Sequence, residues 1–149
     1  MPTEHASLFP PGLHDVVEHE LDNHFLGAFA ESRTRPMLVA GLRSFLAALR
    51  RVGVTFEVWL DGSFCTEKID PNDVDLVVFA DENEVNQLDP NVQRYLAGLL
   101  DRTTTRRQFG CDVLFAPAGD MNLRSYWRGW YGFDRLERPK GMAKLLVTP

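Results

Sequence analysis

Two aspartates separated by one residue, Asp73 and Asp75, lie at the start of an apolar stretch that continues to Phe79. In a β-strand, residues i and i+2 leave the same face, so these two carboxylates would be held close together. Like charges at that distance repel each other, and burying them in an apolar strand costs free energy unless a cation lies between them. Carboxylate oxygens are the ligands that Mg²⁺ and other hard divalent cations prefer. The pair therefore predicts a metal site.

A third aspartate, Asp112, is embedded in a later apolar run. If the two strands are neighbours in a sheet, Asp112 can face Asp73 and Asp75. Three carboxylates can hold two divalent ions about 3.5–4 Å apart, which stabilises both the attacking and the leaving oxygens of a displaced phosphate. Taken singly, Asp73 also suits a turn, and Asp112 suits a strand-edge carboxylate paired with Arg106 or Arg107. Taken together, the three aspartates are predicted to bind metal and to carry the chemistry.

A Gly-Ser pair, Gly62 and Ser63, directly follows a segment of alternating apolar and polar residues. Glycine lets a phosphate approach the backbone without a Cβ in the way, and serine offers a hydroxyl and an amide donor. Two lysines could neutralise phosphate charge, Lys68 in the connection that follows and Lys140 near the C-terminal end. Exposed lysines are also common as solvated side chains. These four residues are the predicted phosphate-binding set.

The strands that must position these residues are visible in the hydrophobic pattern. Residues 54–61 alternate apolar and polar side chains, which predicts a strand with one buried face. Residues 74–79 are almost continuously apolar, which predicts a strand buried on both faces. Residues 111–115 form a third predicted strand, and residues 142–147 suit an edge strand or a short helix.

Helices are predicted between and around the strands, at residues 16–25, 36–51, 90–100 and 120–130. Asp89 and Pro90 give the third of these an N-cap and a first-turn proline, and Asp120 can cap the last. The order of helices and strands predicts a layered domain of the α/β or α+β class.

Composition limits the kinds of protein to consider. The 149 residues suit one domain, and the 44% hydrophobic and 25% charged content is typical of globular proteins. No apolar run suits a membrane span or a signal peptide, so a cytoplasmic location without a membrane partner is expected. The net charge of −5 argues against a broad nucleic-acid-binding surface. Cys65 and Cys111 are predicted to be buried free thiols.

The run Trp59-Leu60-Asp61-Gly62-Ser63, nine further residues, and then Asp73-Val74-Asp75-Leu76 resemble the signature of the polymerase-β-type nucleotidyltransferase superfamily. Asp112 in Cys111-Asp112-Val113-Leu114 is similar to the third carboxylate of that family. The resemblance covers residues 54–116 and is nearest to small uncharacterised bacterial members, with the size of minimal nucleotidyltransferases from toxin–antitoxin and phage-defence modules. It implies a nucleotidyltransferase fold, a small mixed sheet flanked by helices, in a single domain over 1–149 with a helical extension at 1–53.

The resemblance also implies an activity. It implies transfer of a nucleotidyl group from a nucleoside triphosphate, with Mg²⁺ or Mn²⁺, to a hydroxyl of a protein, an RNA or a small molecule. The implied catalytic and metal-binding residues are Asp73, Asp75 and Asp112, and the implied nucleotide-binding residues are Gly62, Ser63, Lys68 and Lys140. A toxin or a modified target would be the protein partner. The second interpretation is a catalytically inactive member of the superfamily that acts as an antitoxin or a regulatory subunit.

Overall fold

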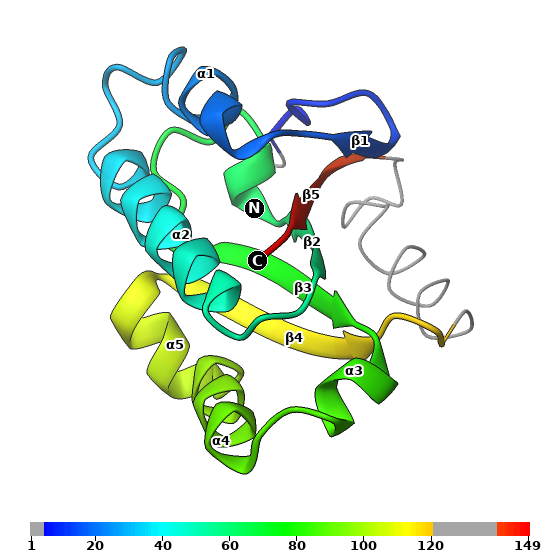
Figure 1. Cartoon of the computed structure of the whole chain (residues 1–149). Helices are drawn as coiled ribbons and strands as arrows, with labels where there is room; N and C mark the ends of the chain where they lie inside the picture. Colours follow the sequence, from blue (N-terminus) through cyan, green and yellow to red (C-terminus); the bar gives the residue numbers. More distant parts are fainter. Residues whose placement is uncertain (1–4, 121–139) are drawn as a thin grey trace.

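The computed structural model describes residues 5–120 and 140–149, and within them five strands form one mixed sheet (Figure 1). The strands are β1 (Gly12–Asp15), β2 (Phe56–Asp61), β3 (Val74–Ala80), β4 (Cys111–Pro117) and β5 (Gly141–Val147). The helices are α1 (Leu21–Phe25), α2 (Arg35–Arg50), α3 (Glu82–Asn86), α4 (Pro90–Leu99) and α5 (Arg102–Phe109), with 3₁₀ turns η1 (Glu18–Glu20) and η2 (Ser63–Cys65). The described chain is therefore a mixed α/β domain, as the sequence predicts.

The strand order in the sheet is β1-β5-β2-β3-β4. Strand β2 is antiparallel to both of its neighbours, β5 and β3, whereas β4 is parallel to β3 and β1 is parallel to β5. Residues 142–147, expected to form an edge strand or a short helix, do form a strand, but β5 lies inside the sheet with β1 beyond it, so the expected edge position is wrong. Gly12 pairs with Gly141 at the start of this added edge.

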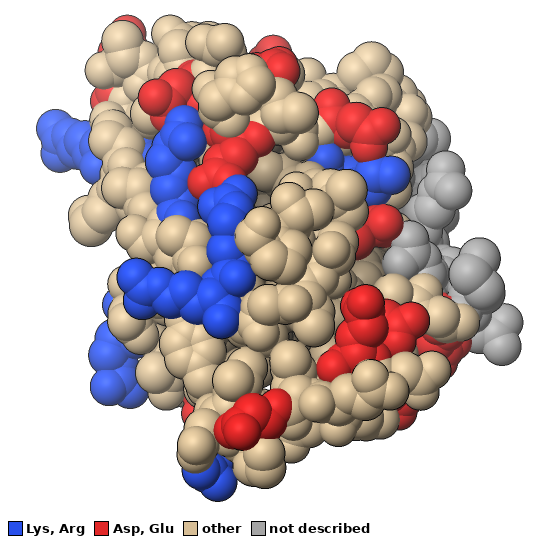
Figure 2. Space-filling model, in the orientation of Figure 1, with Lys and Arg blue, Asp and Glu red and all other residues tan. Residues whose placement is uncertain are grey.

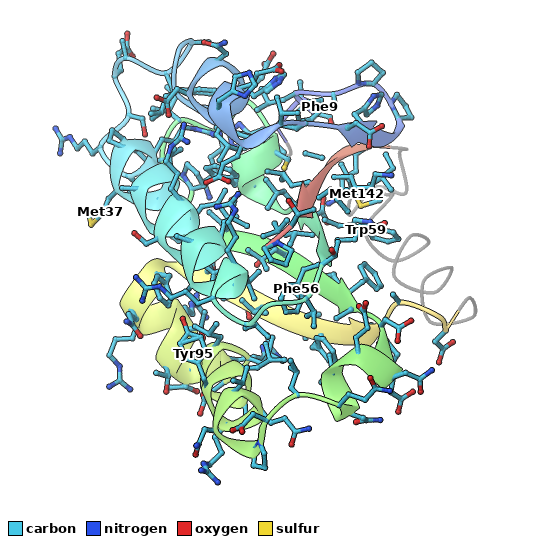
Figure 3. All side chains as sticks on the ribbon, in the orientation of Figure 1. Phe9, Met37, Phe56, Trp59, Tyr95 and Met142 are labelled. Atoms are coloured by element: carbon cyan, nitrogen blue, oxygen red, sulfur yellow. The ribbon has the colours of Figure 1, made fainter. Side chains whose placement is uncertain are left out.

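The two faces of the sheet carry separate apolar clusters. Phe56, Val58 and Leu60 alternate into the main core, which also contains the apolar face of α2. Trp59 points the other way, into a smaller cluster with Val77, Phe79 and Ala116. Figure 3 labels Phe56 and Trp59 on these two sides of β2. One face is therefore covered by helices, and the acidic residues discussed below project from the opposite face.

Helix α2 lies across the sheet and also anchors the N-terminal segment (Figure 1). Its Arg43 pairs with Asp22 at 3.0 Å, and its Arg50 pairs with Glu18. On the face shown in Figure 2, basic side chains gather over α2 next to acidic ones, and a separate group of acidic side chains lies over α3. In the described residues, no helix combines the length and apolarity needed to span a bilayer.

Several predicted elements differ from the structure. The short helix predicted at residues 16–25 is confirmed in part, because the chain there forms the 3₁₀ turn η1 followed by the short helix α1. The predicted last helix falls on residues 121–139, outside the described part of the chain. Strand β1 and helices α3 and α5 were not predicted. The helices predicted at 36–51 and 90–100 and the strands predicted at 54–61, 74–79 and 111–115 are confirmed to within two residues at each end.

Candidate metal centre

Three aspartates form one row across the sheet. In the antiparallel pair β2–β3, Asp61 lies opposite Asp75, and in the parallel pair β3–β4, Asp75 lies opposite Asp112. Residues that are paired in register project from the same face of a sheet. Asp73 directly precedes β3 and adds a fourth carboxylate at this corner. Strands β3 and β4 are neighbours in the sheet, as the sequence analysis required for Asp112 to face Asp73 and Asp75.

Asp73, Asp75 and Asp112 come together as one cluster. Each can offer one carboxylate oxygen such that these oxygens all lie within 4.8 Å of one another. All three side chains are partly buried. A set of three oxygen donors at this spacing fits a hard divalent cation. The structure therefore brings together the three residues that the sequence singles out as metal ligands.

Two arginines of α5 contact this cluster. Arg102 donates from Nε to Asp112 Oδ1 at 2.9 Å and from Nη2 to Oδ2 at 3.1 Å, a two-point ion pair. Arg106 Nη2 lies 3.0 Å from Asp73 Oδ2. The alternative in which Asp112 pairs with Arg106 or Arg107 is wrong in its partner, since Arg102 takes that place. Arg102 was not predicted as a site residue because α5 itself was not predicted.

Local sequence features hold α5 above the cluster. Asp101 caps the helix by accepting a hydrogen bond from the Thr104 amide, and Gly110 ends it in a left-handed conformation with φ of 71°. A Cβ at Gly41 of α2 would overlap the carbonyl oxygen of Phe109, so the two helices touch backbone to backbone there. Strand β4 begins directly after Gly110, which fixes the position of the α5 arginines relative to Asp112.

Asp75 carries most of the electrostatic cost of this arrangement. Burial raises the pKa of Asp75 to about 7, and repulsion from Asp73, Asp112 and Asp61 adds to the shift, with Lys140 opposing it. Burial is the larger cause of the raised pKa, and the three neighbouring carboxylates add an excess of negative charge around Asp75. A bound cation would relieve that excess. This electrostatic demand supports the same fit as the oxygen spacing.

Gly62 makes room for Asp75. Its backbone has a φ of 75°, and a Cβ built on it would overlap the Oδ2 atom of Asp75. Any other residue would therefore displace the carboxylate as well as strain the backbone. Ser63 begins η2, and its carbonyl accepts a hydrogen bond from Thr66 Oγ1 at 2.7 Å. The turn from β2 into η2 lies directly against the acidic cluster, next to the predicted metal ligands.

Asp61 and Lys140 form a buried ion pair beside the cluster. Lys140 Nζ lies 3.1 Å from Asp61 Oδ1, and their side chains are 19% and 4% exposed. Neither Asp61 oxygen makes a hydrogen bond of regular geometry within the described chain, so the contact is an ion pair and not a well-formed hydrogen bond. Burial raises the pKa of Asp61, with Lys140 and then the Gly62 amide acting in the opposite direction.

Asp61 is the site residue that the sequence prediction missed. It belongs to the quoted run ending in Gly62-Ser63, but no role was assigned to it. The signal lies in the alternation of β2, which puts Asp61 on the face of Trp59 and not in the main core. Lys140, predicted as a phosphate ligand, has this carboxylate as its partner in the described residues.

The connection from η2 to β3 is held by Arg35. This side chain is fully buried and donates to the carbonyl oxygens of Phe25, Phe64, Thr66 and Lys68. Lys68 thus contributes its backbone oxygen to the loop, and in the described part of the chain its ammonium is in no ion pair with the acidic cluster. Asp70 accepts from the Arg33 amide at 2.7 Å and ties the same loop to the start of α2.

The two cysteines are buried and free, as predicted. Burial raises the pKa of Cys111 to about 12, with Asp73 adding to the effect. Burial also raises the pKa of Cys65. Both groups are therefore thiols at neutral pH, and neither is suited to be a nucleophile or a metal ligand.

Comparison with known proteins places the chain in a family. No curated protein and no solved structure matches it significantly. The profile of DUF6932, described as a family of unknown function, matches residues 1–146. The chain therefore belongs to the DUF6932 family.

Proposed function

We propose that this protein is a metal-dependent nucleotidyltransferase, with a polymerase-β-type nucleotidyltransferase fold, that moves a nucleotidyl group from a nucleoside triphosphate to a hydroxyl acceptor. The observation that carries the proposal is the cluster of Asp73, Asp75 and Asp112, whose oxygens approach within 4.8 Å of one another. The mixed sheet supports it, because β3 and β4 hold Asp75 and Asp112 in register. So does the Gly62 turn, which leaves space for the Asp75 carboxylate.

The reaction would balance as follows. An acceptor hydroxyl oxygen forms a bond to the α-phosphorus, and the bond from that phosphorus to the oxygen bridging to the β-phosphate breaks. Pyrophosphate leaves with the electron pair, and a carboxylate receives the hydroxyl proton; Asp112 is the proposed group. Mg²⁺ or Mn²⁺ held by Asp73, Asp75 and Asp112 would supply positive charge at the phosphate oxygens.

Other residues of the chain take supporting roles in this proposal. Gly62 and the Ser63 amide and hydroxyl form the turn along which phosphate oxygens would lie. Lys140 keeps Asp61 neutralised, so that four carboxylates can share one corner. Lys68 lies in the connection between η2 and β3 and would contact the triphosphate from there.

The activity is tested with nucleoside triphosphates labelled at the α-phosphate, Mg²⁺ or Mn²⁺, and pools of protein, RNA and small-molecule acceptors. Label is expected to appear on an acceptor from α-labelled but not from γ-labelled triphosphate. Asp73→Ala with Asp75→Ala should reduce transfer by more than about a hundredfold, whereas Glu31→Gln, on an exposed turn, should leave it unchanged. A folded wild-type protein that binds no triphosphate and behaves like the double variant would overturn the proposal.

The second candidate function is a nucleotidyltransferase-fold binding protein without catalysis, such as an antitoxin or a regulatory subunit. The observation in its favour is that Arg102 and Arg106 form ion pairs with Asp112 and Asp73, two of the proposed metal ligands. A partner identified by co-purification with the full chain would then be bound equally well by the Asp73→Ala and Asp75→Ala double variant. Loss of that binding in the double variant would favour catalysis instead.

A further inference from the structure

We propose that Arg102 and Arg106 exchange partners when the site is loaded. In the metal-free protein they hold Asp112 and Asp73, and when a divalent cation takes these carboxylates, the two guanidinium groups bind the phosphate oxygens of the incoming triphosphate. This inference rests on the proposed function and names the substrate-binding cations of the same site. It replaces Lys68 and Lys140 as the main phosphate ligands.

The two ion pairs between α5 and the acidic cluster have the same arrangement. Arg102 and Arg106 are one helical turn apart, so their side chains leave the same side of α5. Each arginine side chain is 60% exposed, whereas Asp112 and Asp73 are 21% and 18% exposed. The carboxylates are therefore fixed in the sheet corner, and the arginines approach them from the solvent. Neither arginine is part of the buried core.

A divalent cation and the two arginines would compete for the same carboxylate oxygens. Arg102 occupies both carboxylate oxygens of Asp112, and Arg106 occupies Oδ2 of Asp73. A cation that uses the three-carboxylate cluster needs an oxygen from each of these residues. The arginine ends of both ion pairs are exposed to solvent, and the positive charge of the arginines repels a metal ion. The arginines and a divalent cation therefore compete for the same carboxylates.

The guanidinium groups of Arg102 and Arg106 are well suited to bind phosphate. A guanidinium is a planar fork of donors that matches the oxygens of a phosphate, and it remains charged throughout the accessible pH range. Once released, both arginines stay at the solvent side of the cluster, because α5 is fixed against α2 by the contact between Gly41 and Phe109. From that side they can meet the phosphates of a triphosphate that approaches along α5. The same helix thus serves the metal-free and the loaded site.

The test compares Arg102→Gln, Arg106→Gln and the double variant with wild type by titration calorimetry, first with Mn²⁺ alone. Because the competing cations are gone, the double variant should bind Mn²⁺ about fivefold more tightly. In the presence of Mn²⁺, it should bind a non-hydrolysable nucleoside triphosphate about tenfold more weakly. Arg107→Gln is the matched control, since this exposed residue lies on the same helix next to Arg106, and it should change neither affinity.

The opposite signs of the two effects separate this proposal from a structural role. If the arginines only oriented the carboxylates, the variants would bind both Mn²⁺ and triphosphate more weakly, and Mn²⁺ affinity that is unchanged or reduced overturns the exchange. Arg102→Lys with Arg106→Lys keeps the charge and guards against a folding defect; it should bind Mn²⁺ with nearly wild-type affinity. Wild type that binds Mn²⁺ but no triphosphate contradicts the proposed function, a result distinct from failure of the Mn²⁺ competition.

Discussion

At the scale of single residues, Asp75 links the site to the stability of the fold. Its pKa rises from 3.8 to about 7 on folding, mainly because of burial and next because of its acidic neighbours. Below about pH 3 the carboxyl is protonated in both states and has no effect on stability. As the pH rises toward 7, the unfolded chain loses this proton while the folded chain keeps it. Stability without metal therefore falls across this interval and stays low above it.

Replacing Asp75 with Asn should remove that loss of stability. We expect Asp75→Asn to be more stable than wild type by about 2 kcal/mol at pH 8 in EDTA, less than the full linkage because the side chain is only partly buried. The difference should vanish at about pH 3, where the carboxyl is protonated in both states. Urea unfolding across the pH range measures it, with Glu31→Gln as the control for removing an exposed acidic charge. A gain of equal size at both pH values would contradict the argument.

Gly62 gives a second prediction at this scale. Gly62→Ala would require a residue with a side chain at a φ of 75° and would push its Cβ into Asp75 Oδ2. We expect a loss of about 2–3 kcal/mol in unfolding free energy and at least a tenfold loss in Mn²⁺ affinity. Gly98→Ala is the matched control, because a Cβ there meets nothing within 4 Å on helix α4. It should be neutral or stabilising. Equal effects at the two positions would refute the role given to Gly62.

The site residues differ in how far the sequence could reveal them. Asp75 and Asp112 could be found because a carboxylate inside an apolar strand is anomalous. Asp61 is more buried than either, but it ends its strand beside a glycine, where an aspartate is ordinary. The pairing of Arg102 with Asp112 and of Arg106 with Asp73 could not be predicted from the sequence, because it depends on where α5 lies relative to β4.

At the scale of elements, the loop between η2 and β3 depends on one buried side chain. Arg35→Met would leave the carbonyl oxygens of Phe64, Thr66 and Lys68 without their donor. We expect a loss of about 3–5 kcal/mol in unfolding free energy and weaker Mn²⁺ binding through the displaced Gly62 turn. Arg51→Met, exposed at the other end of α2, should stay within about 0.5 kcal/mol of wild type. Similar losses in the two variants would contradict this role of Arg35.

The elements that the sequence predicted best have local signals. Helix α4 begins at Pro90 after Asp89, whose side chain accepts from the Asn91 amide, and β2 shows its alternation directly. Helix α5 buries only Thr105 and lacks an apolar face, although Asp101 and Gly110 bracket it as a cap and a left-handed end. Strand β1 has no alternation of its own. It exists because β5 offers an edge, which is information from the far end of the chain.

At the scale of the whole molecule, the Asp61–Lys140 pair joins β2 to the start of β5. Lys140→Met would leave Asp61 charged and unpaired in a buried place, and Asp61→Asn would do the same to Lys140. We expect each to cost about 2–4 kcal/mol, and the double variant to cost less than their sum by about 1–3 kcal/mol. A double-mutant cycle by urea unfolding measures this coupling. Strict additivity would mean that the two charges do not depend on each other.

The inner position of β5 also sets an order of events during synthesis. When the ribosome has made β2, β3 and β4, the edge of β2 that will receive β5 is still open, and β1 has no strand to join. Asp61 likewise has no Lys140 with which to form its ion pair at this stage. Open strand edges are the sites at which nascent chains pair wrongly. The acidic corner can therefore be completed only after Lys140 and β5 have been made, and until then the open edge of β2 is exposed to pairing with other chains.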